Sequence, residues 1–594
     1  MAAPLRIANC SGFYGDRLSA AREMVTGGPI DFLTGDYLAE LTMLILWKSQ
    51  QKDPATGYAV TFLKQMEDVL GEALSRGVKI VTNAGGLNPA GLATAIRTLS
   101  DKLGLNAKIL HIEGDDVLPC LGDLQAAGNE LKHLDTGRPL RELKAKPLTA
   151  NAYLGAWGIV EALNQGADVV VCPRVTDASV VVGPAAWKFG WTRDDWDRLA
   201  GAVAAGHIIE CGTQCTGGNY SFFREVPGLE RPGFPIAEIH EDGSSVITKH
   251  ERTGGLVSVG TVTAQLLYEI DGPKYANPDV VARFDTVELE QVGPDRVLVS
   301  GVRGEPAPAE MKVCLNYLGG FSNQITFVLT GLDIEEKAAL VERTLRQSID
   351  VGQFDAFEIQ LARTDKPKAE DNQQAAAFLK VTAKSQDPKK VGRAFTAPVI
   401  EMALASYPGF FCTTPPQEAS PLAVYWPTLI PAGAVEQCVV LEDGTRIAVP
   451  PIATFDHDKS NGTANNPVAH FDAQPLSGTN HNIPLGTLFG ARSGDKGGNA
   501  NVGIWARDSA GFAWLREFLT IESLRGLLPE AQEMEIRRYE FSNLNALNFV
   551  VVGLLGEGVA SSTRFDPQAK SLGEFLRSRI VPIPQSLLAG AAKS

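Results

Sequence analysis

The stretch GHIIECGTQCTGGN, residues 206–219, places a histidine, a carboxylate and two thiols within fourteen residues. His207 and Glu210 form a natural acid–base pair, because imidazole titrates near neutral pH and burial can raise a carboxyl pKa into the same range. The glycines of the stretch interrupt any helical or strand period. We therefore expect a loop that lines a cavity, with a solvated turn between two elements as the alternative.

The thiols of this stretch suggest two other chemistries. Cys211 or Cys215 could be a nucleophile, but a thiolate needs a cationic neighbour and His207 is the only local one, so acid–base chemistry ranks above covalent catalysis. The spacing H-x3-C-x3-C lacks a partner cluster, which disfavours structural zinc. A divalent ion has four candidate ligands, namely His207, Glu210, Asp115 and Asp177. Their spacing supports no particular ion, so we assign no metal ligand, and the cofactor stays unknown.

Substrate contacts are expected from the rest of the stretch and from a second glycine-rich motif. The first group comprises Gln214, Gly217, Gly218 and Asn219, and the second comprises Asn83, Gly85 and Gly86. In the motif NAGGLNP, the glycine pair precedes a proline-initiated helix, so free backbone N–H groups at a positive helix end would suit a phosphate or carboxylate. It is neither G-x-G-x-x-G nor a Walker motif, so no nucleotide is predicted. The alternative is a tight turn with Asn88 as helix N-cap.

Two further polar motifs resist a purely structural explanation. In RVTD, a helix cap accounts for Thr176 or Asp177 but not for Arg174 beside them, so Arg174 and Thr176 are candidate substrate contacts and Asp177 a candidate catalytic group. In RSGDKGGN, Arg492 and Lys496 lie among glycines and can hold an anion by side chain and backbone together. A charged hairpin tip is the alternative for RSGDKGGN. If the C-terminal domain folds back over the first, these cations complete the cavity.

The first 220 residues alternate apolar strands with helical stretches. The strands are LRIANC, IDFL, VKIVTNAG, AKILHIEG and ADVVVCPRV, and the helices span Tyr37–Gln51, Ala55–Arg76, Pro89–Leu103 and Asn151–Gln165. Apolar runs separated by helices indicate a mainly parallel sheet covered on both faces, a Rossmann-like α/β domain. The polar clusters at residues 9–12, 83–89, 113–116 and 174–177 follow strand ends and should share one rim.

The remaining chain is read as four regions. Residues 221–310 are β-rich, with a hairpin at Asp242-Gly243 and TVTAQLLYEI as one of the strands. Residues 311–430 alternate strand, helix and strand as in an α+β unit of split βαβ type. Residues 431–480 are linker-like, apart from a hairpin at Asp443-Gly444. Residues 481–594 form a second small α+β domain.

Composition limits the partners and the compartment. A net charge of −15 and a pI near 5.2 disfavour nucleic acid or an anionic membrane as the main partner. The eight cysteines are scattered without a CxxC pair, and the longest apolar run, Leu41 to Trp47, is far too short to span a membrane. We expect a cytoplasmic protein with an anionic small-molecule substrate, and a homo-oligomer, as large α/β enzymes commonly are.

Four motifs carry a resemblance to a known family. NAGGLNP, RVTDAS, GHIIECGTQCTGGN and ARSGDKGGNANVGIWAR resemble the acyclic terpene utilisation (AtuA) family, and the match extends from about Leu5 to Leu576. The resemblance implies an N-terminal α/β domain, a C-terminal ferredoxin-like domain, and catabolism of citronellol- or geraniol-type terpenes, or related branched acids, as coenzyme A thioesters. It brings no settled set of catalytic residues, so each catalytic role rests on residue chemistry.

Pathways of this kind carboxylate a branched enoyl-CoA, hydrate it and cleave it to release acetate. Glu210 with His207 suits either the hydration or the C–C lyase step, with Arg174 pairing the free carboxylate of an acyl-CoA or organic-acid substrate. The Gly85-Gly86 or Gly217-Gly218 amides would hold the enolate oxygen. The alternative is a noncatalytic acyl-CoA-binding or scaffolding subunit with a biotin-dependent carboxylase as partner.

Overall fold

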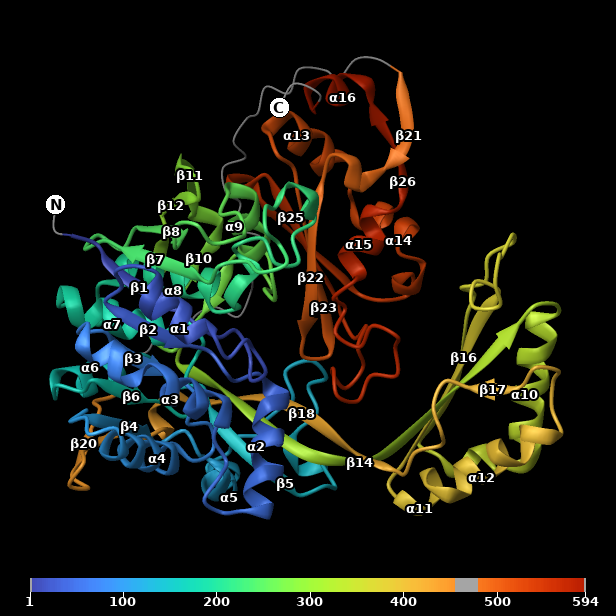
Figure 1. Ribbon diagram of the computed structural model, residues 1–594, viewed down its shortest axis with the longest axis horizontal. Helices are drawn as coiled ribbons and strands as arrows, with labels where there is room; N and C mark the ends of the chain where they lie inside the picture. Colours follow the sequence, from blue (N-terminus) through green and yellow to red (C-terminus); the bar gives the residue numbers. More distant parts are fainter. Residues whose placement is uncertain (1–2, 454–478, 592–594) are drawn as a thin grey trace. The chain divides into compact units, whose positions relative to one another are not determined.

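The computed structural model describes residues 3–453 and 479–591, and these residues divide into two compact units (Figure 1). Unit 1 comprises Met1–Asn316, Tyr425–Val559 and Asp566–Ser594, and unit 2 comprises Tyr317–Val424 and Ala560–Phe565. Unit 1 therefore contains both the N-terminal α/β region and the C-terminal domain. Within the described part of the chain, no helix is long and apolar enough to cross a membrane.

Five parallel strands form the centre of the largest sheet in unit 1. In spatial order they are β1 (Leu5–Asn9), β2 (Phe32–Gly35), β3 (Lys79–Thr82), β6 (Val169–Val171) and β4 (Ile109–Glu113). They are buried on both faces, which explains why they read as continuous apolar runs without alternation.

Antiparallel strands extend this sheet on both sides to eleven strands. Beyond β1 lie β7 (Pro235–Ile239), β8 (Ser245–Lys249), β12 (Arg296–Ser300) and β11 (Glu288–Gly293), and beyond β4 lie β19 (Cys438–Val440) and β20 (Arg446–Ala448). The fold is therefore a mixed α/β sheet. The strand order of its parallel block, β1-β2-β3-β6-β4, also differs from the order of the doubly wound dinucleotide fold.

The edge strands β19 and β20 come from the stretch that the sequence suggested was linker-like. The hairpin expected at Asp443-Gly444 is confirmed, and it pairs with β4 through Val439 and Ile112. Residues 454–478 of that stretch lie outside the described residues.

Helices cover both faces of the sheet (Figure 1). One face packs against α1 (Ala20–Gly27), α3 (Val60–Ser75) and α4 (Pro89–Lys102), and the other packs against α6 (Trp157–Asn164), α7 (Ser179–Phe189) and α8 (Trp196–Ile209). Ile80 belongs to the core between the sheet and helices α1, α3 and α4, whereas the adjacent Val81 lies outside that core. This alternation is expected because successive side chains of a strand point to opposite faces of the sheet.

Smaller elements complete the N-terminal part of unit 1. These are α2 (Glu40–Lys52), α5 (Leu121–Ala126), β5 (Pro147–Ala152), α9 (Val259–Leu266), β9 (Lys274–Ala276), β10 (Val281–Arg283) and β13 (Arg303–Glu305). The strand predicted for TVTAQLLYEI is wrong, because most of it forms α9. Ser258 caps that helix by accepting from the Thr261 N–H at 3.2 Å while its own N–H donates to Thr261 Oγ1 at 3.0 Å.

The C-terminal domain is an antiparallel sheet with helices on one face. Its strand order is β22 (Gly490–Lys496), β23 (Asn499–Trp505), β25 (Ala546–Val551) and β24 (Ile536–Phe541). Its helices are α13 (Ser509–Phe518), α14 (Ile521–Leu527) and α15 (Leu572–Arg577), and β21 (Asn480–Pro484) pairs with β26 (Ile580–Pro584), which precedes α16 (Gln585–Ala591). Val502 and Phe549 pack into the helix-covered core. Gly494 and Gly503 lie on the opposite face.

Unit 2 has the expected split βαβ arrangement. The second half of β14 (Glu310–Thr330) and β15 (Ala356–Ala362) are both antiparallel to β16 (Ala376–Ser385), which lies between them. The helices are α10 (Ile334–Ser348), α11 (Pro388–Val391) and α12 (Arg393–Glu401), β17 (Phe411–Cys412) pairs with β14, and β18 (Ser420–Pro431) follows. Phe327, Leu345 and Phe395 are central to its core.

Close packing of α8 against the β7–β8 hairpin supports a first prediction. A methyl group at Gly201 would lie 2.1 Å from the Gly243 carbonyl oxygen, and backbone cannot move aside cheaply. Gly201→Ala should therefore lower the free energy of unfolding by about 1–3 kcal/mol, measured as a lower melting temperature. Gly122→Ala is the control, since a methyl there meets nothing within 4 Å. Equal melting temperatures for the two variants would contradict this packing.

Candidate active site

His207 and Glu210 lie at the end of α8 rather than in a loop. The helix continues through Ile209, and Glu210 still has helical backbone angles, so the loop expected over residues 206–219 begins only at Cys211. Every residue from Leu199 to Ile209 is buried. A helix buried on all sides has no polar face, and for this reason its period is absent from the sequence.

The side chains of this pair meet in a buried environment. His207 Nδ1 lies 3.1 Å from Glu210 Oε1, and the two residues are 1% and 9% exposed. Neither imidazole nitrogen forms a hydrogen bond with a described residue, and neither does Glu210 Oε2. Buried polar atoms are nearly always paired, so three unpaired atoms at one place point to a ligand or a proton-transfer role.

Burial gives the pair unusual protonation states. It lowers the pKa of His207 to about 4, with a further contribution from nearby Lys496 that Glu269 opposes. Burial also raises the pKa of Glu210 well above its ordinary value, and Asp177 and Glu269 add to this effect. The imidazole is therefore the free base at neutral pH, and the raised pKa of the carboxyl group favours its protonated form. The site presents a general base and a general acid side by side.

Residues that sequence reasoning missed surround the imidazole. Its ring centroid lies 4.9 Å from that of Tyr275 and 5.3 Å from that of Phe284, and those two rings stack at 4.9 Å. Gln265 Nε2 donates to the His207 carbonyl at 3.4 Å, and Gln265 Oε1 has no partner among the described residues. Gln265 lies on α9, which was predicted as a strand, and Tyr275 on the three-residue strand β9, so neither carried a motif signal.

The strand ends of the parallel block bring a second set of charges toward the pair. Arg174, 2% exposed, donates to Asp177 Oδ1 at 2.8 Å and to the Leu38 carbonyl at 3.0 Å, and its guanidinium lies 4.1 Å from the centre of the Tyr153 ring. Burial raises the pKa of Asp177, which Arg174 opposes. Burial and Asp177 raise the pKa of Asp36, a residue at the end of β2 that no motif indicated.

The Asn83 side chain supports this arrangement rather than facing a ligand. Its Nδ2 donates to Asp36 Oδ1 at 2.5 Å, and its Oδ1 accepts from the Tyr37 N–H at 2.8 Å. Thr176 contacts Ser179, with 2.6 Å between their hydroxyl oxygens, as expected at the start of a helix. Both side chains are thus occupied by protein groups.

The glycine amides expected to bind an anion are already used. Gly85 N–H donates to the Cys172 carbonyl at 3.1 Å, and Gly86 N–H donates to the Asn83 carbonyl at 3.2 Å. Asn88 Oδ1 accepts from the Gly91 N–H at 2.9 Å, so this motif is a tight strand-to-helix turn with an N-cap. The amides of Gly217 and Gly218 donate to the carbonyls of Gln214 and Thr213 at 3.1 and 2.9 Å. The enolate role predicted for these four amides is wrong.

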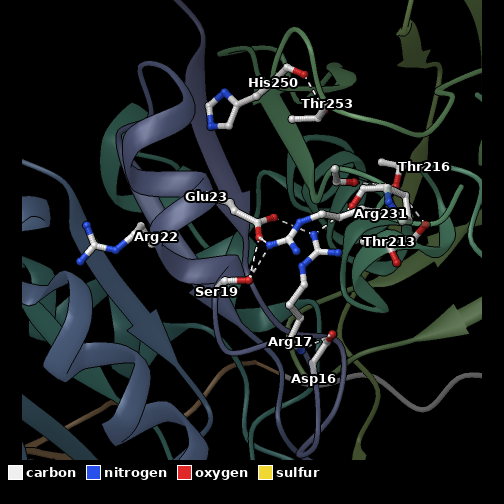
Figure 2. A network of polar contacts seen from close by, with 12 residues as sticks. Asp16, Arg17, Ser19, Arg22, Glu23, Thr213, Thr216, Arg231, His250 and Thr253 are labelled. Carbon is white, nitrogen blue, oxygen red and sulfur yellow. Dashed lines mark hydrogen bonds and ion pairs between the residues drawn. The ribbon is translucent and has the colours of Figure 1, made fainter. Parts of the chain in front are cut away.

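A polar network fixes the loop that follows Glu210 (Figure 2). Thr216 Oγ1 lies within hydrogen-bond distance of the Thr213 and Gly233 carbonyls, at 2.9 and 2.7 Å. On the neighbouring α1, Glu23 binds Arg17 at 2.7 Å and Arg231 at 2.5 Å. Arg17 also donates to the Pro232 carbonyl at 2.9 Å, which ties the network to residue 233. Asn219 adopts a left-handed backbone with φ of 60°, as a turn requires.

The C-terminal domain reaches the same place through a strand. Arg492 to Lys496 belong to β22, so the loop expected over residues 492–499 is reduced to the turn at Gly497-Gly498. Arg492, Gly494 and Lys496 alternate onto one face. A methyl at Gly494 would lie 2.6 Å from the Tyr268 ring, so glycine permits the close approach of this strand. Arg492 donates to Gln214 Oε1, and Lys496 Nζ donates to the Glu269 carbonyl at 2.8 Å.

The turn that follows Lys496 is held by an aspartate of the N-terminal region. Asp135 Oδ2 accepts from the Gly498 N–H at 3.0 Å, and Oδ1 accepts from Asn499 Nδ2 at 2.8 Å. Burial and interdomain hydrogen bonds therefore fix the position of Lys496 near His207. The site is completed by residues of the same chain.

Family models match the N-terminal region and the C-terminal domain of the chain separately. The model for acyclic terpene utilisation family protein AtuA matches residues 5–441. The chain belongs to the acyclic terpene utilisation family. The model for the AtuA ferredoxin-like domain matches residues 483–582, the region of β22 to β26. Membership supports a catabolic role. No curated protein and no solved structure matches the chain.

A half-buried ion pair lies beside Arg174 in the AtuA region of the chain. Burial alone would raise the pKa of Glu40, yet Lys312 at 3.6 Å and Arg174 bring it down to about 2. Glu40 Oε1 also accepts from the Tyr153 hydroxyl at 3.0 Å. Sequence reasoning missed Glu40 and Lys312 because each stands alone in an ordinary stretch.

The other chemistries considered for the AtuA motifs find less support. Burial and Glu210 raise the pKa of Cys211 well above its ordinary value, and burial raises that of Cys215, so neither thiolate is populated at neutral pH. Among residues 3–453 and 479–591, no group of three or more His, Cys, Asp or Glu side chains is arranged to hold a metal ion.

The expectation that residues 206–219 line a cavity stays a prediction. Two cavities of about 510 and 360 Å³ are lined by residues elsewhere, between Arg516 and Glu540 and between Pro227 and Asp295. None of their lining residues belongs to the cluster around His207.

The lowered pKa of His207 predicts a pH-dependent stability. Between about pH 4 and its ordinary value of 6.5, the unfolded chain binds a proton that the folded chain does not. The stabilisation is therefore complete above pH 6.5 and is lost as the pH falls toward 4, by about 3 kcal/mol. His207→Gln should remove this part of the slope, measured by melting temperature across pH 4–7.

Two comparisons make the measurement specific. The raised pKa of Glu210 acts in the opposite sense, because the stabilisation from its carboxyl group is lost as the pH rises above 4.5. The change of wild-type stability with pH is therefore the sum of the His207 and Glu210 contributions. His481→Gln removes an exposed imidazole and is the matched control. A His207→Gln slope equal to that of the wild type would show that the imidazole is not held neutral.

Proposed function

We propose that the chain is an acid–base lyase of acyclic-terpene catabolism that adds water to a branched, α,β-unsaturated acyl-CoA carboxylate. The observation that carries this proposal is the buried contact of 3.1 Å between a neutral His207 and a protonated Glu210. Hydration requires one group that takes a proton and one that gives a proton, and this pair holds both at neutral pH.

The proposed step balances without an external reactant. His207 takes a proton from water as the water oxygen bonds to the β-carbon, and Glu210 gives its proton to the α-carbon. The carbon–carbon double bond becomes a C–O and a C–H bond. The imidazolium then passes its proton to the Glu210 carboxylate across the 3.1 Å contact, which restores both groups. Low polarity around the pair favours this return, because separated charges are costly there.

Two cations have complementary roles in the proposal. Arg174 pairs with the free carboxylate of the substrate, replacing part of its bond to Asp177. Lys496 lies near both His207 and Glu210 and stabilises the thioester oxygen as negative charge develops on it, the role first assigned to the glycine amides. The pair is buried, so substrate entry displaces side chains around it.

The proposal predicts a turnover defect without a binding defect. Glu210→Gln keeps the size and a hydrogen-bonding amide but removes the transferable proton. Conversion of a branched enoyl-CoA carboxylate should fall by about 10²- to 10⁴-fold, while affinity for the thioester changes by less than about threefold. Conversion is followed by mass spectrometry, where hydration adds the mass of water and C–C cleavage gives two smaller products.

Glu72→Gln is the control, because Glu72 lies on the exposed side of α3 and pairs with Arg76. Full activity of Glu210→Gln would remove Glu210 from the mechanism. Retention of the thioester without conversion by the wild type, together with co-purification of a biotin-dependent carboxylase, would instead identify a noncatalytic binding subunit.

A further inference from the structure

Arg492 is a buried cation without an anionic partner. The residue is 7% exposed, and its side chain donates to the neutral amide of Gln214. Across the described residues, no carboxylate forms an ion pair with it. A guanidinium removed from water normally has a carboxylate or a ligand anion to compensate the lost hydration. Arg174 illustrates the usual case, because it pairs with Asp177.

A second cation shares an aromatic ring with Arg492. The Arg492 guanidinium lies 4.3 Å from the centre of the Tyr268 ring, and Lys570 Nζ lies 4.6 Å from it. Lys570 also donates to the Tyr268 hydroxyl. Tyr268 is 3% exposed, and its ring contacts both cations at the junction of the AtuA region and the ferredoxin-like domain.

The carboxylates near this pair do not neutralise it. Glu269 Oε1 lies 3.4 Å from Lys570 Nζ, and Asp495 Oδ1 lies 3.9 Å from it. Burial and Glu269 raise the pKa of Asp495 to about 7, so its charge is only partly present at neutral pH. Both carboxylates contact Lys570, so among the described residues Arg492 has no carboxylate paired with it.

We propose that Arg492 and Lys570, which both contact the Tyr268 ring, bind an oxyanion group of the substrate, a carboxylate or a phosphate, at a subsite separate from Arg174. The inference rests on the proposed function for the identity of the occupant. Its consequence is a substrate class: a ligand with two separated anionic groups, one at each subsite. Arg492 presents the forked donors suited to an oxyanion, and Lys570, whose side chain is 40% exposed, lies toward solvent.

The test measures binding rather than turnover, so failure of the lyase proposal does not affect it. Three probes are titrated calorimetrically into the full chain: 3-methylglutarate, coenzyme A and the monocarboxylate isovalerate. The variants are Arg492→Met, Arg492→Lys and Lys570→Met. Either 3-methylglutarate or coenzyme A should bind the wild type, more tightly than isovalerate. Its affinity should fall at least tenfold in Arg492→Met and about threefold in Lys570→Met, and Arg492→Lys should recover part of the loss.

The probe that responds identifies the source of the oxyanion. A loss confined to 3-methylglutarate assigns a carboxylate, and a loss confined to coenzyme A assigns a phosphate. Arg537→Met removes an exposed cation of the same domain and should leave every affinity unchanged. If Arg492→Met fails to fold, Lys570→Met, at a partly exposed position, still decides the question. The proposal is overturned if the wild type binds neither 3-methylglutarate nor coenzyme A. It is also overturned if the affinities of the folded variants for these probes stay within twofold of the wild type.

Discussion

Desolvation at the end of α8 is the constraint on which the site depends. The helix is buried along its whole second half, so its last turn cannot place a polar side chain in water. The same loss of hydration that would destabilise two charged groups lowers the pKa of His207 and raises the pKa of Glu210. A base and an acid thus coexist at one pH because the charged form of each is unfavourable there, and the surrounding charges only adjust this balance.

The candidate site also depends on the close approach of the C-terminal sheet to the N-terminal region. Gly494 and Gly503 have no side chain on the face of the C-terminal sheet that meets Leu267 and Tyr268, and a methyl at either glycine would lie 2.6 Å from one of those side chains. This closeness allows Asn548 Nδ2 to donate to the Asp271 carbonyl at 2.8 Å. The cations of β22 are placed by this packing, so their chemistry depends on the absence of side chains beside them.

Much of the fold was predictable because local patterns agree with tertiary structure there. Continuous apolar runs identified the five parallel strands, and Asp242-Gly243 identified a hairpin that the β7–β8 pairing confirms. Helix α8 was missed because total burial removes its period, and β22 was taken for a loop because charges and glycines replace its alternation. Both errors fall on elements that have no face exposed to solvent.

The sequence predicted a residue of the candidate site only where an ionisable side chain stands within a distinctive motif. His207, Glu210, Arg174, Asp177 and Lys496 stand in distinctive motifs, and the structure brings them together. Asp36, Gln265, Tyr275 and Lys570 contribute through tertiary packing alone, and nothing adjacent in sequence marks them. Glycine amides were misjudged because sequence shows a donor without showing whether a nearby carbonyl accepts from it.

The distance along the chain between Asp36 and Lys570 has a consequence for synthesis. Long-range contacts of this kind close late, because the loops between them must first lose conformational entropy. A nascent chain that has released its first 480 residues holds His207 and Glu210 but none of the cations of β22. Folding of the final hundred residues onto Asp135 and Tyr268 is thus the event that places Lys496 near His207 and Glu210.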